Sequence, residues 1–137
     1  MSDAIKRFVS KNAIRMTCDY ADKNPNLEEN DSEWAKKANH WKCVLKMKGK
    51  QFTVFYSMGC GLSGEPKTYE VIESLKMDAF TIMNEGQKFE EWASSLGYDT
   101  DSRKAHKTWI TCKRQAYKFF RFLGVDAVND LEKCEEE

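Results

Sequence analysis

Two kinds of hydrophobic periodicity divide the chain. From 41 to 58, apolar and polar residues alternate, as in strands that bury one face. From 68 onward, apolar residues recur every three or four positions, as in amphipathic helices. Residues 4–14 show a shorter helical pattern and 14–20 a further alternating one. The order predicts an α+β fold: a small antiparallel β-sheet, made of a hairpin and one further strand, packed on one face by three to four α-helices.

The hairpin is the clearest local prediction. A two-residue turn at Gly49 and Lys50 would place Gly at the first central position, as a type II′ turn requires. One face then carries eight apolar or half-polar side chains: Trp41, Cys43, Leu45 and Met47 opposite Met58, Tyr56, Val54 and Phe52. A slip of one residue would scatter these pairs across both faces of the sheet, so the register is well specified.

The helices that follow have recognisable ends. Thr68 is a plausible N-cap for a helix that runs to about Asn84, and Gly97 is the expected C-cap of a short helix that begins near Phe89. A long helix over 103–123 and a last one over 125–133 are separated by Gly124. We expect a single domain over 1–137, divided into an amino-terminal helix (1–13), a sheet (14–58) and a helical part (67–135).

The long helix has two very different faces. At about 100° per residue, one face is apolar, with Ala105, Trp109, Cys112, Ala116, Phe119, Phe120 and Leu123. The opposite face carries Arg103, Lys107, Arg114, Lys118 and Arg121, and no acidic residue interrupts the helix. This basic face would extend about 27 Å, which is long enough to follow a phosphate backbone or an acidic groove of a protein. The alternative is a solvated face, neutralised in part by the acidic residues after 125.

Charge and cysteine content narrow the picture further. The 22 basic and 22 acidic residues cancel over the 137 positions, so only the local charge blocks point to a partner. The five cysteines are odd in number and include no C-x-x-C pair, which indicates free thiols in a reducing compartment. The first 14 residues lack the apolar core of a signal peptide, and no apolar run approaches about 20 residues.

Three arrangements were considered for catalysis or ligand binding. A zinc site would need several of the potential ligands His40, Cys43, Cys60, His106 and Cys112 to converge, and their spacing is not that of known zinc motifs. Asp99 and Asp101 can act as paired carboxylates, but helix capping explains them as well. The glycine-rich loop at 59–66 lacks the Lys-Ser/Thr ending of a P-loop. We therefore assign no catalytic residue, metal or cofactor.

Five short motifs resemble a family of small, uncharacterised proteins that bacteriophages and prophages encode. They are Asn-His-Trp at 39–41, Ser-Gly-Glu-Pro at 63–66, Phe-Glu-Glu-Trp at 89–92, Gly-Tyr-Asp-Thr-Asp-Ser-Arg-Lys-Ala at 97–105 and Phe-Leu-Gly at 122–124. No activity is established for the family, so no residue roles carry over. The resemblance implies a phage or mobile-element origin and a cytoplasmic location in a bacterial host. Small phage proteins without a catalytic signature often inhibit host defence, as anti-CRISPR proteins do.

These observations favour a non-enzymatic protein that binds a host macromolecule stoichiometrically, such as a CRISPR nuclease complex. The expected contact surface comprises Arg103, Lys104, Lys107, Arg114, Lys118 and Arg121 with Tyr98, Asp99 and Asp101. A nucleic-acid-binding accessory protein of phage replication or gene control is the first alternative. A small nucleotide-acting enzyme, which would use Asp99, Asp101 and the 59–66 loop, is the second. We expect no membrane partner, and a dimer through Val44 and Phe55 or through the edge of the sheet stays open.

Overall fold

The computed structural model gives an α+β fold in which the strands precede most of the helices. It describes residues 3–21, 39–58, 64–83, 89–95, 97, 99 and 103–134. The elements are α1 (Asp3–Lys11), β1 (Arg15–Ala21), β2 (Asn39–Met47), β3 (Lys50–Met58), α3 (Thr68–Ile82), α4 (Phe89–Ser95), α5 (Arg103–Leu123) and α6 (Val125–Glu132). The described residues fall into two compact units, Met1–Ile72 and Glu73–Glu135, so that the boundary lies inside α3. The predicted fold class is confirmed.

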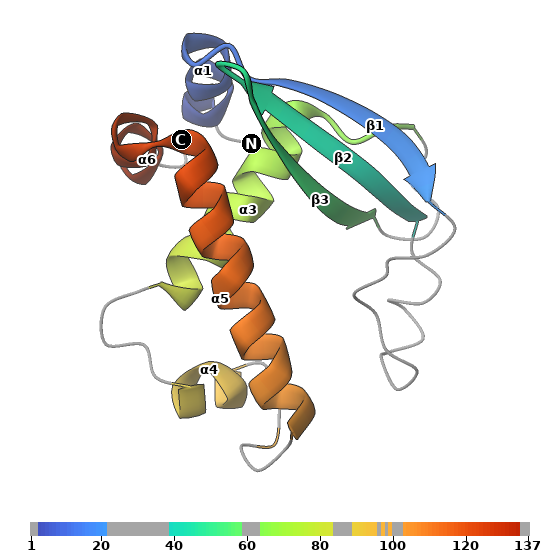
Figure 1. Ribbon diagram of the computed structural model, residues 1–137, viewed down its shortest axis with the longest axis vertical. Helices are drawn as coiled ribbons and strands as arrows, with labels where there is room; N and C mark the ends of the chain where they lie inside the picture. Colours follow the sequence, from blue (N-terminus) through green and yellow to red (C-terminus); the bar gives the residue numbers. More distant parts are fainter. Residues whose placement is uncertain are drawn as a thin grey trace. The chain divides into compact units, whose positions relative to one another are not determined.

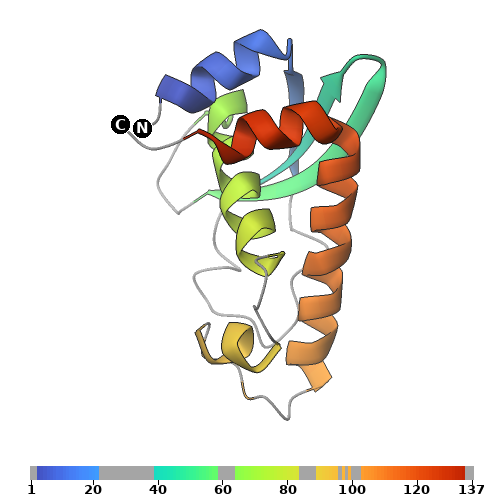
Figure 2. The same cartoon turned by 90° about the vertical axis from the view of Figure 1, so that its left-hand side faces the viewer.

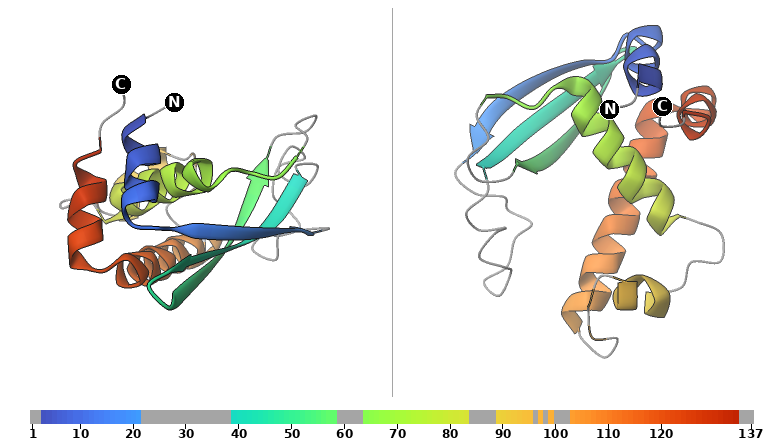
Figure 3. Two further views of the ribbon diagram at one scale, coloured as in Figure 1. Left: turned by 90° about the horizontal axis from the view of Figure 1, so that it is seen from above. Right: turned by 180° about the vertical axis from the view of Figure 1, so that it is seen from behind.

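The first unit contains a three-stranded antiparallel sheet in the order β1-β2-β3 (Figure 1). Residues 15–21 of β1 pair with residues 40–46 of β2, which confirms the further strand expected at 14–20. The three strands lie side by side and twist along their length, as β-sheets do (Figure 3). Cys18 is directly opposite Cys43 in this ladder.

The hairpin turn differs from its prediction by one residue. Met47 pairs with Lys50, so the two central residues are Lys48 and Gly49 rather than Gly49 and Lys50. Both have positive φ, 49° and 78°, as a type I′ turn requires. A type I′ turn matches the right-handed twist of the strands, as a type II′ turn also does, and here it places Lys48 in the left-handed region.

This shift of the turn moves each strand pairing by two residues. Leu45 therefore lies opposite Phe52 instead of Val54, and Trp41 lies opposite Tyr56 instead of Met58. Because side chains alternate with a period of two, the apolar face is preserved. Its central members are buried as expected: Cys43, Leu45, Met47, Phe52 and Val54.

His40 departs from the expectation of a surface imidazole, because it is only 2% exposed. Its Nδ1 lies 2.8 Å from Oγ of Ser57, the residue directly opposite on β3. Within the described residues, Nε2 has no hydrogen-bond partner. The alternation along β2 places His40 on the face opposite Cys43, but His40 is buried on that face, so the expectation of an exposed imidazole is wrong.

The predicted helices are present, with ends that differ from the prediction by two residues or fewer. The amino-terminal helix stops at Lys11, two residues before its predicted end. For α3, the N-cap is not the Thr68 side chain: the backbone N–H of Lys67 donates to Oε1 of Glu70 at 2.9 Å, which is half of a capping box. Gly97, at the end of α4, has the positive φ of 77° that a C-cap glycine adopts.

The second unit is built around α5, whose ends match the predicted 103–123. The chain turns sharply at Gly124, where φ is 86°, and α6 runs on in a new direction (Figure 2). The ammonium of Lys76 on α3 donates a hydrogen bond to the carbonyl of Cys134, just beyond α6. The end of α6 is thereby attached to α3 within this unit.

None of the helices in the described ranges combines the length and the apolar content that a membrane crossing needs.

Candidate functional site

The outward face of α5 carries a continuous line of exposed side chains, which we call the α5 ridge. It consists of Arg103, Lys107, Ile110, Arg114, Tyr117, Lys118 and Arg121, all of them exposed. The steps from 103 to 107, 110, 114, 117 and 121 alternate between four and three residues. At about 100° per residue, all seven lie within about 50° of a common line along the helix. The ridge therefore presents one narrow strip rather than a scattered set of charges.

The opposite side of the helix explains why this strip faces solvent. Ala105, Ala116, Phe119 and Leu123 are all buried, and Phe119 has no exposed surface. The ring of Phe120 also packs against Phe80 of α3, with 5.2 Å between the ring centroids. Burial of this apolar stripe holds the helix, so the ridge residues are presented on a supported element rather than on a loop.

The ridge is strongly positive because α5 contains no aspartate or glutamate. Among the residues that the structure describes, no ion pair involves any of its five cations. Ile110 and Tyr117 lie between the cations and are 46% and 55% exposed. At about 100° per residue these two lie at the edge of the basic face, and their exposure makes them part of one mixed cationic and apolar surface.

Two other polar residues of α5 are engaged in packing instead. Lys113 places its ammonium 4.3 Å from the centroid of the Trp109 ring, a cation–π contact. The ring of His106 stacks on Phe89 of α4, with 3.8 Å between centroids. Phe89 also meets Trp109 edge-on at 5.3 Å, and α4 lies beside the amino-terminal end of α5 (Figure 3). His106 therefore belongs to a packed aromatic cluster.

Much of the predicted contact surface before α5 lies outside the described residues. Tyr98 and Asp101 lie outside the described residues, as does most of the 59–66 loop. Asp99 is exposed, and Lys104 belongs to α5 by its backbone. Only the five cations of the ridge are therefore brought together as expected, at Arg103, Lys107, Arg114, Lys118 and Arg121.

Two assignments to the faces of α5 need correction. Cys112, expected in the core, is exposed, and Trp109 is only half-buried. Phe122, which helix geometry places on the flank between the apolar and basic faces, is 4% exposed. Burial therefore extends beyond the stripe at this end of the helix, where α6 follows at Gly124 and contacts α5. A helical wheel describes α5 alone, so it cannot include what the following helix covers.

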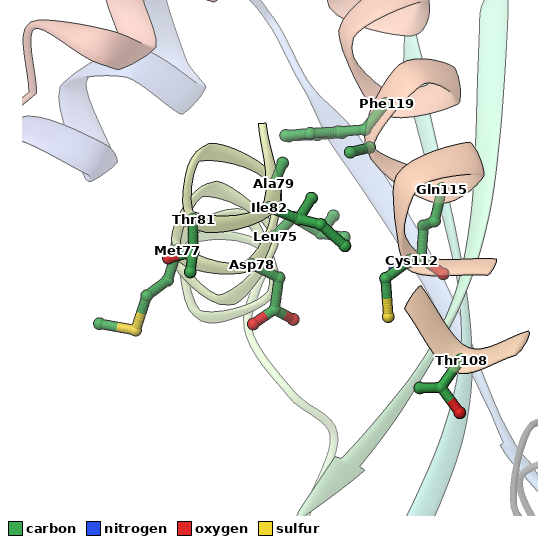
Figure 4. A pocket seen from close by; sticks show the side chains of 11 residues that line it. Leu75, Met77, Asp78, Ala79, Thr81, Ile82, Thr108, Cys112, Gln115 and Phe119 are labelled. Atoms are coloured by element: carbon green, nitrogen blue, oxygen red, sulfur yellow. The ribbon is translucent and has the colours of Figure 1, made fainter. Parts of the chain in front are cut away.

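The exposure of Cys112 has a local cause, a pocket between α3 and α5 (Figure 4). Its volume is about 370 Å³, and most of its lining is apolar, with Leu75, Ile82 and Phe119 among the lining residues. Asp78 of α3 and Cys112 of α5 lie on opposite sides of it (Figure 4). The sequence did not predict this pocket. Both helices have regular apolar stripes, and nothing in their spacing indicates that the two stripes leave a space between them.

Desolvation by the neighbouring protein atoms changes the acidity of both groups that line the pocket. It raises the pKa of the Asp78 carboxyl above its ordinary value. It also raises the pKa of the Cys112 thiol, and the negative charge of Asp78 raises that pKa further. Since a thiol with a raised pKa is a weaker nucleophile at neutral pH, the pair is not arranged for nucleophilic catalysis. The pocket can hold a small apolar group near one carboxyl.

The candidate zinc ligands do not converge in the part of the chain that the structure describes. No group of three or more His, Cys, Asp or Glu side chains there is arranged to hold a metal ion. His40 and Cys43 lie on opposite faces of β2, while His106 is stacked on Phe89. Cys60 lies outside the described residues.

Comparisons with protein-family models, curated proteins and solved structures find no match for the chain. The case for function therefore rests on the α5 ridge and on the residues that support it.

Proposed function

We propose that the protein acts by stoichiometric binding, with the α5 ridge docked on an acidic surface of a partner macromolecule. The observation that carries this proposal is the combination of five cations and two large apolar side chains on one exposed strip. Arginine and tyrosine are enriched at the energetic centres of protein interfaces, and a helix face with regular three- and four-residue spacing suits a groove.

The apolar members of the ridge favour a protein partner. Binding to a nucleic-acid backbone needs cations, and it gives little reason to expose Ile110 among them. A protein groove, by contrast, offers both carboxylates for Arg114 and apolar pockets for Ile110 and Tyr117. The charges would steer the encounter, while the apolar anchors would slow dissociation.

Inhibition of a bacterial defence complex is the specific form of this proposal. It rests on the resemblance of the five motifs to phage-encoded proteins and on the acidic clusters that nuclease centres present to metal ions. The test is phage growth on a host with CRISPR immunity that expresses either the wild type or the double variant Arg114→Glu/Lys118→Glu. Protection of the phage by the wild type alone supports the proposal, and equal protection by both forms contradicts it.

Nucleic-acid binding is the alternative function, and a salt titration separates it from the first. If all five cations contact phosphates of duplex DNA, the logarithm of the binding constant falls with the logarithm of salt concentration with a slope of about −4.5. Micromolar binding with that slope would favour the nucleic-acid function. A flat or absent response to DNA and RNA would favour a protein partner.

A further inference from the structure

Two cysteines of the sheet lie in direct contact. Cys18 of β1 is opposite Cys43 of β2, and their sulfurs share a hydrogen bond with 3.5 Å between the Sγ atoms. The contact lies within the first unit, and both residues are free thiols. We propose that Cys18 and Cys43 form a dithiol site that closes to a disulfide across β1 and β2 when a low-molecular-weight disulfide, such as oxidised glutathione, acts on it.

The backbone is already suitable for this bond. Directly opposed residues of an antiparallel pair have Cα atoms about 4.5 or 5.5 Å apart, and disulfides span about 4.4–6.8 Å. Closure brings the sulfurs from 3.5 Å to about 2.05 Å, which small rotations about χ1 accomplish without any shift of the strand register.

The two thiols differ in access, and this difference sets the order of the reaction. Cys43 has no exposed surface, whereas Cys18 is half-buried. Burial raises the pKa of both thiols, that of Cys43 to about 12, so both are protonated at neutral pH. Cys18 therefore meets the oxidant first, through its small thiolate fraction, and the reaction is slow.

The proposed step balances as a thiol–disulfide exchange. Cys18 loses its proton and attacks one sulfur of oxidised glutathione, which breaks that disulfide and releases one glutathione that takes up a proton. Cys43 then loses its proton and attacks Sγ of Cys18, and the second glutathione leaves and is protonated. The protein gives up two electrons and two protons, and one glutathione disulfide becomes two glutathione thiols.

Equilibration of the full chain in glutathione redox buffers, followed by acid trapping and mass spectrometry, tests this assignment. The disulfide lowers the mass by about 2 Da, and neither Cys18 nor Cys43 carries glutathione in the expected product. Tryptic digestion should then yield residues 16–23 joined to residues 43–46. The oxidised protein should melt about 5–10 °C higher than the reduced one, because the bond closes a loop across 25 positions.

Two matched variants make the result specific. Cys112→Ser, which removes an exposed thiol on α5, should keep both the mass loss and the linked peptides. Cys18→Ser should lose both and keep the melting temperature of the reduced protein. The proposal is overturned if the linked peptides contain a different cysteine, or if prolonged equilibration leaves Cys18 and Cys43 reduced or carrying only glutathione.

Discussion

The two sides of α5 are made from the same 21 residues and have opposite requirements. The inner side buries Phe119 completely, and it contributes to the free energy of unfolding through close packing. The outer side exposes Arg114 and Tyr117 and makes no recorded ion pair within the described residues. The first side is therefore explained by folding, whereas the second is the surface on which we propose that a partner binds.

This difference also separates what a substitution should change. A residue of the inner side alters the free energy of unfolding and affects binding only through the folded fraction. A residue of the α5 ridge alters binding while the melting temperature stays almost constant. Variants of the two sides therefore test whether the comparison holds.

The largest effect is expected from Phe119→Ala. It removes a fully buried ring from the inner side, and such truncations cost about 3–5 kcal/mol of unfolding free energy. Urea denaturation monitored by circular dichroism measures the loss. A cost below about 1 kcal/mol would mean that this side is not the core of the second unit.

Removal of both apolar anchors should act on binding instead. Ile110→Ala with Tyr117→Ala should weaken partner binding about 10- to 100-fold, because exposed aromatic and aliphatic residues at an interface centre are frequent hot spots. Both positions are exposed and alanine favours helix, so the melting temperature should change by less than about 2 °C. Unchanged affinity would mean that only the charges of the ridge contribute to binding, and it would favour the nucleic-acid alternative.

The smallest effect concerns the pocket, where the inner side of α5 is incompletely covered. Because the pKa of Asp78 is raised in the folded protein, its charged form destabilises the fold, and stability falls as the pH rises above its ordinary value of 3.8. Asp78→Asn removes this charge near the carboxyl end of α3, where the helix dipole also disfavours it. Its melting temperature should exceed that of the wild type by about 1–3 °C at pH 7, and the difference should vanish at pH 3.

The sequence predicted periodic features well, but it predicted poorly which side chains are buried by neighbouring elements. The ends of α5 and the apolar face of the hairpin followed from spacing alone. The hairpin turn at Lys48 and Gly49 did not, because type I′ and type II′ turns both match the twist of the strands and a glycine suits either turn. Each side chain still lies on its predicted face of the sheet, because the resulting shift in register is two residues.

The candidate site shows the same division. The five cations of the ridge were predicted by their spacing, and their exposure agrees. The open pocket beside Cys112, the buried His40 and the buried Phe122 were not predicted, since each depends on which neighbouring element covers it. The Cys18–Cys43 contact needed the pairing of β1 with β2, which no local pattern specifies.

The central claim is that the α5 ridge is the binding surface. Its most direct test begins with capture of a partner from lysate of a phage-infected host. The dissociation constant is then measured for the wild type, for Arg114→Glu/Lys118→Glu and for a control, Lys46→Glu/Lys50→Glu, which places the same charge change on exposed strand positions. We predict binding weaker by about 100-fold or more for the ridge variant, with wild-type affinity within about threefold for the control and nearly equal melting temperatures for all three. Wild-type affinity in the ridge variant, or an equal loss in both variants, would contradict the claim.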